Sequence, residues 1–251
     1  STDDTAAVAH ALDGPVAVIE QKNQGPAAAR NTGVARTKAD CVAFLDADDV
    51  WECEKLAKQL AVLEEHPEVG MVFTNTVDTF DDGRRAGRPH VDFDRCALLE
   101  CPHATENRNV YRFQEYATST LLLRNVIHTS TVLARREAVL NAGGFDEAYR
   151  FMEDVNLWFE IARTERLAYI AEVLSYHRIH DTNMMQDRTR ADTAQIEVLA
   201  HWLDRGDVKW LDDHRNRLRQ RLARLEASSA RRLLAAGRRG DARSLFRKSL
   251  S

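Results

Sequence analysis

Short apolar runs alternate with helix-prone segments over the first part of this chain, and this alternation constrains the fold more than any other feature. Strand-like runs cover residues 16–19, 41–45 and 69–73, and helix-prone stretches cover 27–37 and 52–65. Strands that alternate with helices are typical of a layered α/β fold whose sheet is mainly parallel. The sequence therefore predicts an α/β domain built on a buried, mainly parallel sheet.

The middle of the chain contains a polar region and then further periodic segments. Residues 78–112 are turn-rich, and Asp82-Gly83 is expected at the tip of a hairpin. A strand is predicted over 130–134. A helix with an apolar stripe is predicted over 153–164, and an extended segment over 167–179. These elements extend the α/β pattern beyond the first three predicted strands.

Everything after about residue 187 is predicted to be helical, ending in a helical hairpin broken at Gly237 and Gly240. The stretch from Arg215 to Lys248 contains twelve Lys or Arg and two acids, whereas the whole chain has a formal net charge of −4. A basic helical tail is suited to an anionic surface such as a lipid membrane. The alternative interpretation is an ordinary solvated helix face.

The composition is that of an ordinary globular protein, with 44% hydrophobic and 29% charged residues in 251. No run approaches the ~20 apolar residues of a membrane span, and no segment has the pattern of a signal peptide. The four cysteines form no dense framework, so reduced thiols in the cytoplasm are expected. A zinc site is one alternative, although the spacing matches no known zinc pattern; its ligands would be His90, Cys96, Cys101 and His103.

The segment "NQGPAAARNTG" (residues 23–33) is the first candidate binding motif. A turn holding Asn23 and Gly25 leads into an Ala-rich helix, so backbone N–H groups and the helix N-terminus can approach an anion closely. Arg30, farther along the helix, can add a guanidinium for a phosphate. The alternative is an ordinary loop and helix whose alanines pack on the sheet.

The segment "FLDADD" is the second motif, because three carboxylates follow an apolar run directly. Residues two apart on an extended segment point the same way, so Asp46 and Asp48 can face one ligand, and the small Ala47 leaves room for it. Such oxygen ligands suit Mg²⁺ or Mn²⁺ shared with substrate phosphates. In the simpler alternative Asp46 ends the strand and Asp48 caps a following helix. That alternative does not account for Asp49.

The third motif is the pair Glu153-Asp154 in "FMEDVNLWFEIA", at the first turn of a predicted amphipathic helix. Carboxylates there interact favourably with the helix dipole, which is one sufficient explanation. The functional alternative is a general base, which requires a carboxylate close to a substrate hydroxyl.

Taken together and in order, "STDDT", "NQGPAAARNTG", "FLDADD", "GGFDE" and "EDVNLW" resemble family-2 glycosyltransferases of the GT-A fold. The resemblance implies a Rossmann-like, nucleotide-sugar-binding sheet flanked by helices over residues 1–185, followed by an α-helical extension over 186–251. It also implies an inverting enzyme that moves a sugar from a nucleotide-diphosphate sugar to an acceptor hydroxyl. The expected metal is Mg²⁺ or Mn²⁺, and the expected setting is synthesis of surface polysaccharide or glycoconjugate.

The resemblance also assigns roles to individual residues. Asp154 would be the catalytic base, with Glu153 beside it. Asp48 would bind the metal, and "YHRIH", which is similar to the family's Y-R-x-H ending, adds His180. The nucleotide sugar would contact the residues Asn23, Gly25, Arg30, Asp46 and Ala47. The acidic residue that is common two positions after the E-D pair is Asn156 here, which favours Asp154 as the base.

Members of this family have a strand and a helix before the segment that corresponds to Ser1, so the chain is expected to be N-terminally incomplete. This leaves open a catalytically impaired module that binds a sugar nucleotide or a partner. A nucleotidyltransferase is a further alternative, but it would need a basic triphosphate-binding loop. The expected partners are the donor and a saccharide or lipid-linked acceptor, with peripheral contact at the inner membrane face through the basic tail. No nucleic-acid partner is expected.

Overall fold

The computed structural model describes residues 4–86, 89–91, 103–107, 109–113, 126–180, 188–206 and 215–248. Its centre is a seven-stranded sheet in the order β1-β6-β3-β7-β5-β4, with β2 paired to β7. The strands are β1 (Cys41–Ala43), β2 (Val50–Trp51), β3 (Val69–Phe80), β4 (His103–Asn107), β5 (Val110–Phe113), β6 (Leu133–Arg135) and β7 (Arg166–Ile179). The helices are α1 (Thr5–His10), α2 (Pro26–Arg36), α3 (Lys55–Glu65), α5 (Arg136–Asn141), α6 (Glu153–Thr164), α7 (Arg188–Asp204), α8 (Arg215–Ala235) and α9 (Arg239–Lys248).

The sheet is mixed, so the prediction of a mainly parallel sheet is wrong. Strands β3 and β7 form a parallel pair, whereas β6 is antiparallel to both β1 and β3. Strands β1 and β3 therefore run in the same direction, as the alternation of strands and helices predicted. They do not pair with each other because β6, from later in the chain, lies between them.

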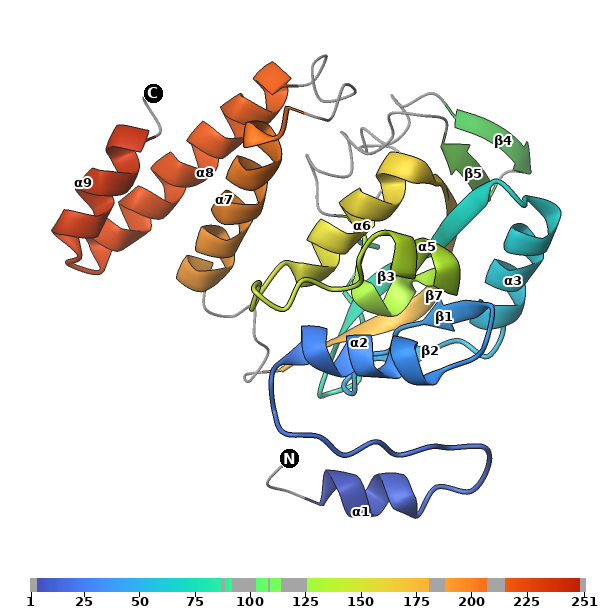
Figure 1. Cartoon of the computed structure of the whole chain (residues 1–251). Helices are drawn as coiled ribbons and strands as arrows, with labels where there is room; N and C mark the ends of the chain where they lie inside the picture. The colour runs from blue at the N-terminus through green and yellow to red at the C-terminus, as the bar shows by residue number, and fades with distance from the viewer. Residues whose placement is uncertain are drawn as a thin grey trace.

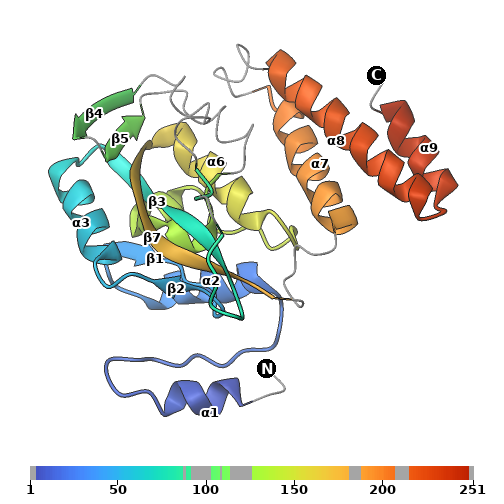
Figure 2. The ribbon, with the colours of Figure 1, turned by 180° about the vertical axis from the view of Figure 1, so that it is seen from behind.

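Helices cover both faces of the sheet, which explains why the first part of β3, residues 69–73, has no polar side chain. Met71 and Phe73 belong to the large core cluster that contains residues of α2, α5 and α6. Val72, between them, belongs to a second cluster with Val62 and Leu63 of α3. Figure 1 shows α2, α5 and α6 in front of the sheet, and the reverse view brings β3 and β7 forward (Figure 2). A strand buried on both faces has no polar side to alternate with.

The predicted strand over residues 16–19 is not formed. Val16 and Ile19 are exposed in an irregular segment between α1 and α2. A strand is stable only when its backbone groups pair with a neighbour, and the pairing assigned to β1 is with β6. The short helix α1 precedes this segment, and none of its residues is buried.

The remaining predictions for the α/β region agree closely with the structure. Helix α6 has the predicted bounds, and β7 contains the predicted extended segment. The turn at Gly83 has a φ of 79°, and Phe80 N donates to Arg84 O at 2.9 Å, so the hairpin tip is confirmed. The predicted strand over 130–134 is shorter, because a 3-10 turn at Thr129–Thr131 precedes β6.

The C-terminal helices are joined to the α/β region by a shared core. Trp202 of α7 is fully buried, and its Nε1 donates to Asn156 Oδ1 of α6 at 3.0 Å. Gly237, with a φ of 76°, follows the end of α8, as predicted. Gly240 does not interrupt a helix, because it is the second residue of α9. The prediction of two units, 1–185 and 186–251, remains a prediction.

Only part of the alternative zinc site lies within the described residues. Of the residues considered for a zinc site, Cys96 and Cys101 lie outside the described residues. Cys41 and Cys53 are free thiols. Within the described ranges, no helix combines the length and the apolar character needed to cross a membrane.

Candidate active site

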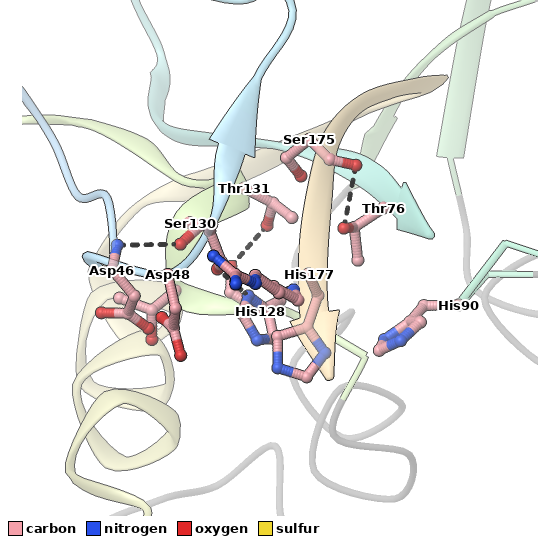
Figure 3. A network of polar contacts seen from close by, with 12 residues as sticks. Asp46, Asp48, Thr76, His90, His128, Ser130, Thr131, Ser175 and His177 are labelled. Atoms are coloured by element: carbon pink, nitrogen blue, oxygen red, sulfur yellow. Dashed lines mark hydrogen bonds and ion pairs between the residues drawn. The ribbon is translucent and has the colours of Figure 1, made fainter. Parts of the chain in front are cut away.

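The acidic loop that holds Asp46 to Asp49 lies between β1 and β2 and is fixed at both ends. Asp49 N donates to Asp46 O at 3.1 Å, which closes a tight turn. Asp46 N donates to Ser130 Oγ at 3.1 Å (Figure 3). Trp51 Nε1 donates to Ser130 O at 2.7 Å. The loop is therefore attached to the 3-10 turn that precedes β6, and Ala47 is exposed at its tip.

Asp48 does not cap a helix. The chain continues from the loop into β2, and α3 begins only at Lys55. Asp48 Oδ2 instead lies 2.9 Å from His180 Nε2, just beyond the end of β7. Burial opposes ionisation of Asp48, but the hydrogen bond and positive charge of His180, together with His177, hold its pKa below the ordinary value. The structure thus brings together the two residues that the sequence assigned to a metal.

Asp49 explains why three carboxylates occur in this loop. Its side chain is buried, and Oδ1 accepts a hydrogen bond from the backbone N–H of Arg178 at 3.2 Å. Its Oδ2 lies 3.6 Å from His128 Nδ1. Asp49 therefore connects the loop to β7 from inside, whereas Asp46 and Asp48 are partly exposed.

Arg30, which belongs to the first motif, contacts residues of the second and third motifs directly. Its guanidinium donates to Asp46 Oδ1 and to Glu153 Oε1, each at 2.7 Å, and lies over the Phe145 ring at 5.4 Å. Burial lowers the pKa of Arg30, but the two carboxylates outweigh it and raise the pKa. Arg30 thus forms ion pairs with both the acidic loop and α6.

Asn23 and Gly25 contact each other in the turn that precedes α2. Gly25 has a φ of 95°, which favours glycine, and its N–H donates to Asn23 Oδ1 at 3.1 Å. It is the residue immediately before α2, which starts with Pro26. The predicted turn and helix are therefore present, while the role in donor binding remains a prediction.

Glu153 and Asp154 differ sharply in environment. Glu153 is 6% exposed and paired with Arg30. Burial and the neighbouring charge of Asp154 raise the pKa of Glu153, and Arg30 only partly offsets this. Asp154 is partly exposed, with Oδ2 accepting from Thr129 Oγ1 at 2.6 Å and Oδ1 accepting from Val155 N at 2.7 Å. Asp154 is thus held in position and is the more accessible of the two carboxylates.

The residue before this pair has an uncommon backbone conformation. Met152 has a φ of 64°, and no other non-glycine residue in the described part of the chain has a positive φ. Left-handed backbone is unfavourable for a side chain of this kind and is concentrated at functional sites. It turns the chain abruptly into α6, with Glu153 as the first helical residue.

The "NTG" and "GGFDE" segments are joined by a pair of hydrogen bonds. Asn31 Nδ2 donates to Phe145 O at 2.8 Å, and Phe145 N donates to Asn31 Oδ1 at 2.8 Å. Gly144 has a φ of 73°, and a Cβ there would lie 2.8 Å from Asn31 Oδ1. Asn31 therefore holds the glycine turn against α2, a role that the sequence alone did not indicate.

The sequence did not predict a histidine cluster that extends from the acidic loop. The rings of His128 and His177 have centroids 4.4 Å apart, and those of His177 and His90 are 6.0 Å apart. Figure 3 shows these rings following one another away from Asp46 and Asp48. Burial and His177 lower the pKa of His128. Asp78 and His177 lie opposite each other in β3 and β7, and the sequence alone does not show this register.

Comparison with known proteins agrees with this fold. A mannosyltransferase from Pyrobaculum calidifontis, solved with GDP-Man and Mn²⁺, aligns over 93% of this chain and 61% of its own, with a TM-score of 0.57 and 20% identity. TarS from S. aureus aligns over 89% of this chain and 35% of its own, with a TM-score of 0.54 and 17% identity. The mixed sheet and its flanking helices are therefore those of the GT-A fold.

Sequence comparison then gives the family. The family model described as glycosyl transferase family 2 matches residues 1–139, and the chain belongs to this family. An uncharacterized glycosyltransferase of Haemophilus influenzae is 26% identical over 80% of this chain and 63% of its own length. The amylovoran biosynthesis glycosyltransferase AmsE of Erwinia amylovora is 26% identical over 59% of this chain and 48% of its own length. The chain thus spans about half to two thirds of these curated relatives.

Proposed function

We propose that the protein is an inverting glycosyltransferase that moves a sugar from a nucleotide-diphosphate sugar to an acceptor hydroxyl. The observation that carries the proposal is the bridge from Asp46 through Arg30 to Glu153, because it joins the predicted donor loop to the predicted base helix. Three motifs far apart in sequence then serve one site. Family membership favours this activity over nucleotidyl transfer.

The two side chains predicted to bind a metal at the acidic loop fit a divalent ion. Asp48 and His180 offer a carboxylate oxygen and an imidazole nitrogen 2.9 Å apart, and both side chains are partly exposed. A mixed oxygen and nitrogen set suits Mn²⁺ better than Mg²⁺, which prefers oxygen ligands alone. When bound, such an ion would neutralise charge on the donor diphosphate. The mannosyltransferase solved with GDP-Man and Mn²⁺ supports the same choice.

In this proposal, Asp154 removes the proton from the acceptor hydroxyl. The acceptor oxygen then forms a bond to the anomeric carbon as the bond from that carbon to the diphosphate oxygen breaks, which inverts the centre. Thr129 holds the Asp154 carboxylate through its 2.6 Å hydrogen bond. Glu153, paired with Arg30, orients the start of α6 and does not take the proton. Accurate placement of a base is what makes such a proton transfer efficient.

A double substitution of Asp46 and Asp48 by Asn tests the donor site. The change removes both charges at constant volume, and we expect it to abolish Mn²⁺-dependent binding of the donor. Isothermal calorimetry with a panel of nucleotide sugars that includes GDP-mannose, with and without Mn²⁺, measures this. Asp40→Asn is the matched control, because Asp40 is an exposed acid at the start of β1.

Circular dichroism must show that the double variant keeps the wild-type fold. If that variant binds nucleotide sugar with unchanged Mn²⁺ dependence, the acidic loop is not the donor site. If the wild type binds nucleotide sugar in the presence of Mn²⁺ but transfers no sugar, the alternative of a non-catalytic sugar-nucleotide-binding module is favoured.

The acceptor in this proposal is a saccharide or a lipid-linked saccharide, in the synthesis of a surface polysaccharide or glycoconjugate. The similarity to an amylovoran biosynthesis glycosyltransferase supports this setting. A lipid-linked acceptor would require the enzyme to work at the inner membrane surface, and the basic C-terminal helices suit that location.

Two exposed arginine stripes carry the membrane proposal. On α8 the stripe has a seven-residue spacing, which places its members on one face, and on α9 the spacing is four. The stripes consist of Arg217, Arg224 and Arg231 on α8 and of Arg239, Arg243 and Arg247 on α9. Each basic residue near an anionic membrane contributes about 1 kcal/mol.

Changing the three α8 arginines to Gln is therefore expected to weaken adsorption to anionic vesicles by roughly 10²-fold. Sedimentation with vesicles containing phosphatidylserine or only phosphatidylcholine, at low and high salt, measures this effect. Replacing Lys38, Lys58 and Arg84, three basic residues of the α/β region, by Gln provides the charge-matched control. Equal binding to both vesicle types at low salt would reduce the stripes to a solvated surface.

A further inference from the structure

Among the described residues, one group of three His, Cys, Asp or Glu side chains has ligand atoms close enough to share a cation. It consists of Asp78, His90 and His177, whose ligand atoms all lie within 4.8 Å of one another. We propose that this group, here named the His₂Asp cluster, is a transition-metal site of the Zn²⁺ type. It is distinct from the predicted donor-metal residues Asp48 and His180.

The backbone brings the cluster together from three directions. Asp78 lies on β3 and His177 lies directly opposite on the parallel strand β7. The chain then returns after the hairpin at Gly83, and His90 N donates to Thr76 O at 2.9 Å. The position of each ligand is therefore set by strand pairing or by a backbone hydrogen bond.

The side chains converge on a single carboxylate oxygen. His90 Nε2 lies 2.7 Å and His177 Nδ1 lies 2.9 Å from Asp78 Oδ1. A cation bound here would require the lone pairs of His90 Nε2 and His177 Nδ1, which lie nearest to Asp78 Oδ1, to face the ion.

The ligand chemistry indicates the class of ion. Two imidazole nitrogens and one carboxylate oxygen form the set that Zn²⁺ and related first-row ions prefer, whereas Mg²⁺ and Ca²⁺ prefer oxygen alone. The side chains of His90, Asp78 and His177 are 34%, 30% and 22% exposed, so an ion can reach them from solvent. Three protein ligands leave one tetrahedral position for water or a ligand.

The surroundings of His177 add support for the orientation of its ring. The partly buried ring of His128 lies 4.4 Å from it, centroid to centroid, and is itself next to Asp49. This ring contact limits the orientations that the His177 side chain can adopt. His177 also lies close enough to Asp48 to favour its ionised form. A cation in the cluster would therefore add positive charge beside the acidic loop.

Co²⁺ and Zn²⁺ binding to the metal-free protein tests the proposal, without any assay of transfer. An Asp48→Asn host removes the donor-metal carboxylate, so the remaining binding reports on the cluster. We expect this host to bind one Co²⁺ with visible d–d absorption and to be protected by Zn²⁺ against thermal unfolding. Adding His90→Asn and His177→Asn should weaken binding by more than the ~10–100-fold that loss of a second-shell partner costs.

His201→Asn in the same host is the matched control, because His201 is an exposed histidine on α7, and it should leave Co²⁺ binding unchanged. Thermal unfolding in EDTA must be similar in all variants, and single His90→Asn and His177→Asn variants replace the double if it fails to fold. Wild-type Co²⁺ affinity in the cluster variants, equal loss in His201→Asn, or no binding by the host would each overturn the proposal. Loss of donor binding in Asp48→Asn with the cluster intact would separate the two sites.

Discussion

Asp154→Asn is expected to lower the turnover of sugar transfer by about 10²–10⁴-fold, the range typical of losing a general base. Asp154 is the accessible member of the carboxylate pair, and Thr129 and Val155 N already hold it through hydrogen bonds of 2.6 and 2.7 Å. The single oxygen of the amide keeps only one of these two acceptor contacts, and the amide cannot take a proton. Donor affinity should remain at the wild-type value, because the change lies outside the acidic loop.

Glu153→Gln is the comparison that separates the two carboxylates. Because Glu153 is buried against Arg30, its loss should cost less turnover and should act mainly through stability. Steady-state transfer and nucleotide-sugar calorimetry are measured on both variants. If Asp154→Asn keeps wild-type transfer and Glu153→Gln loses it, the roles are reversed. If both keep it, the base lies elsewhere.

Much of the fold could be predicted from the sequence, because its strongest signals are local. The apolar stripe of α6 and the continuous apolar run of β3 report burial that each segment carries by itself. The order of strands is not local. No property of β1 or β3 shows that β6 will enter between them. No property of residues 16–19 shows that they will find no partner strand within the described part of the chain.

The candidate site shows the same division. The motifs that contain Arg30, Asp46 and Glu153 were expected to serve one site, and the structure joins them through two ion pairs. Their assigned roles remain predictions. The His₂Asp cluster was not predicted, because its members become neighbours only through the register of β3 with β7 and the return of the chain at His90. Histidines that are scattered along a sequence carry no spacing signal of their own.

The Arg30 bridge leads to the largest expected effect on stability. Removing one partner of a buried ion pair leaves an uncompensated charge, which typically costs about 3–5 kcal/mol. Arg30→Met should therefore lower the free energy of unfolding by about that amount, because Glu153 is 6% exposed and loses its cation. The double variant Arg30→Met/Glu153→Met should recover most of the loss, since no buried charge remains. Asp46→Asn, which removes the more exposed partner, should cost much less.

The pH dependence of the Arg30→Met variant distinguishes this cause from a loss of packing. The folded-state pKa of Glu153 is raised by burial and by Asp154, and loss of Arg30 should raise it further. A carboxyl group whose folded pKa exceeds its unfolded pKa stabilises the fold when protonated, and this stability is lost as pH rises through the folded pKa. The gap in unfolding free energy between wild type and Arg30→Met should therefore narrow as pH falls from 7.5 toward about 5. Urea denaturation at both pH values measures the gap. If the gap is equal at both pH values, or if the double variant is as unstable as Arg30→Met alone, packing of the arginine stem accounts for the loss, and the charge of Glu153 does not.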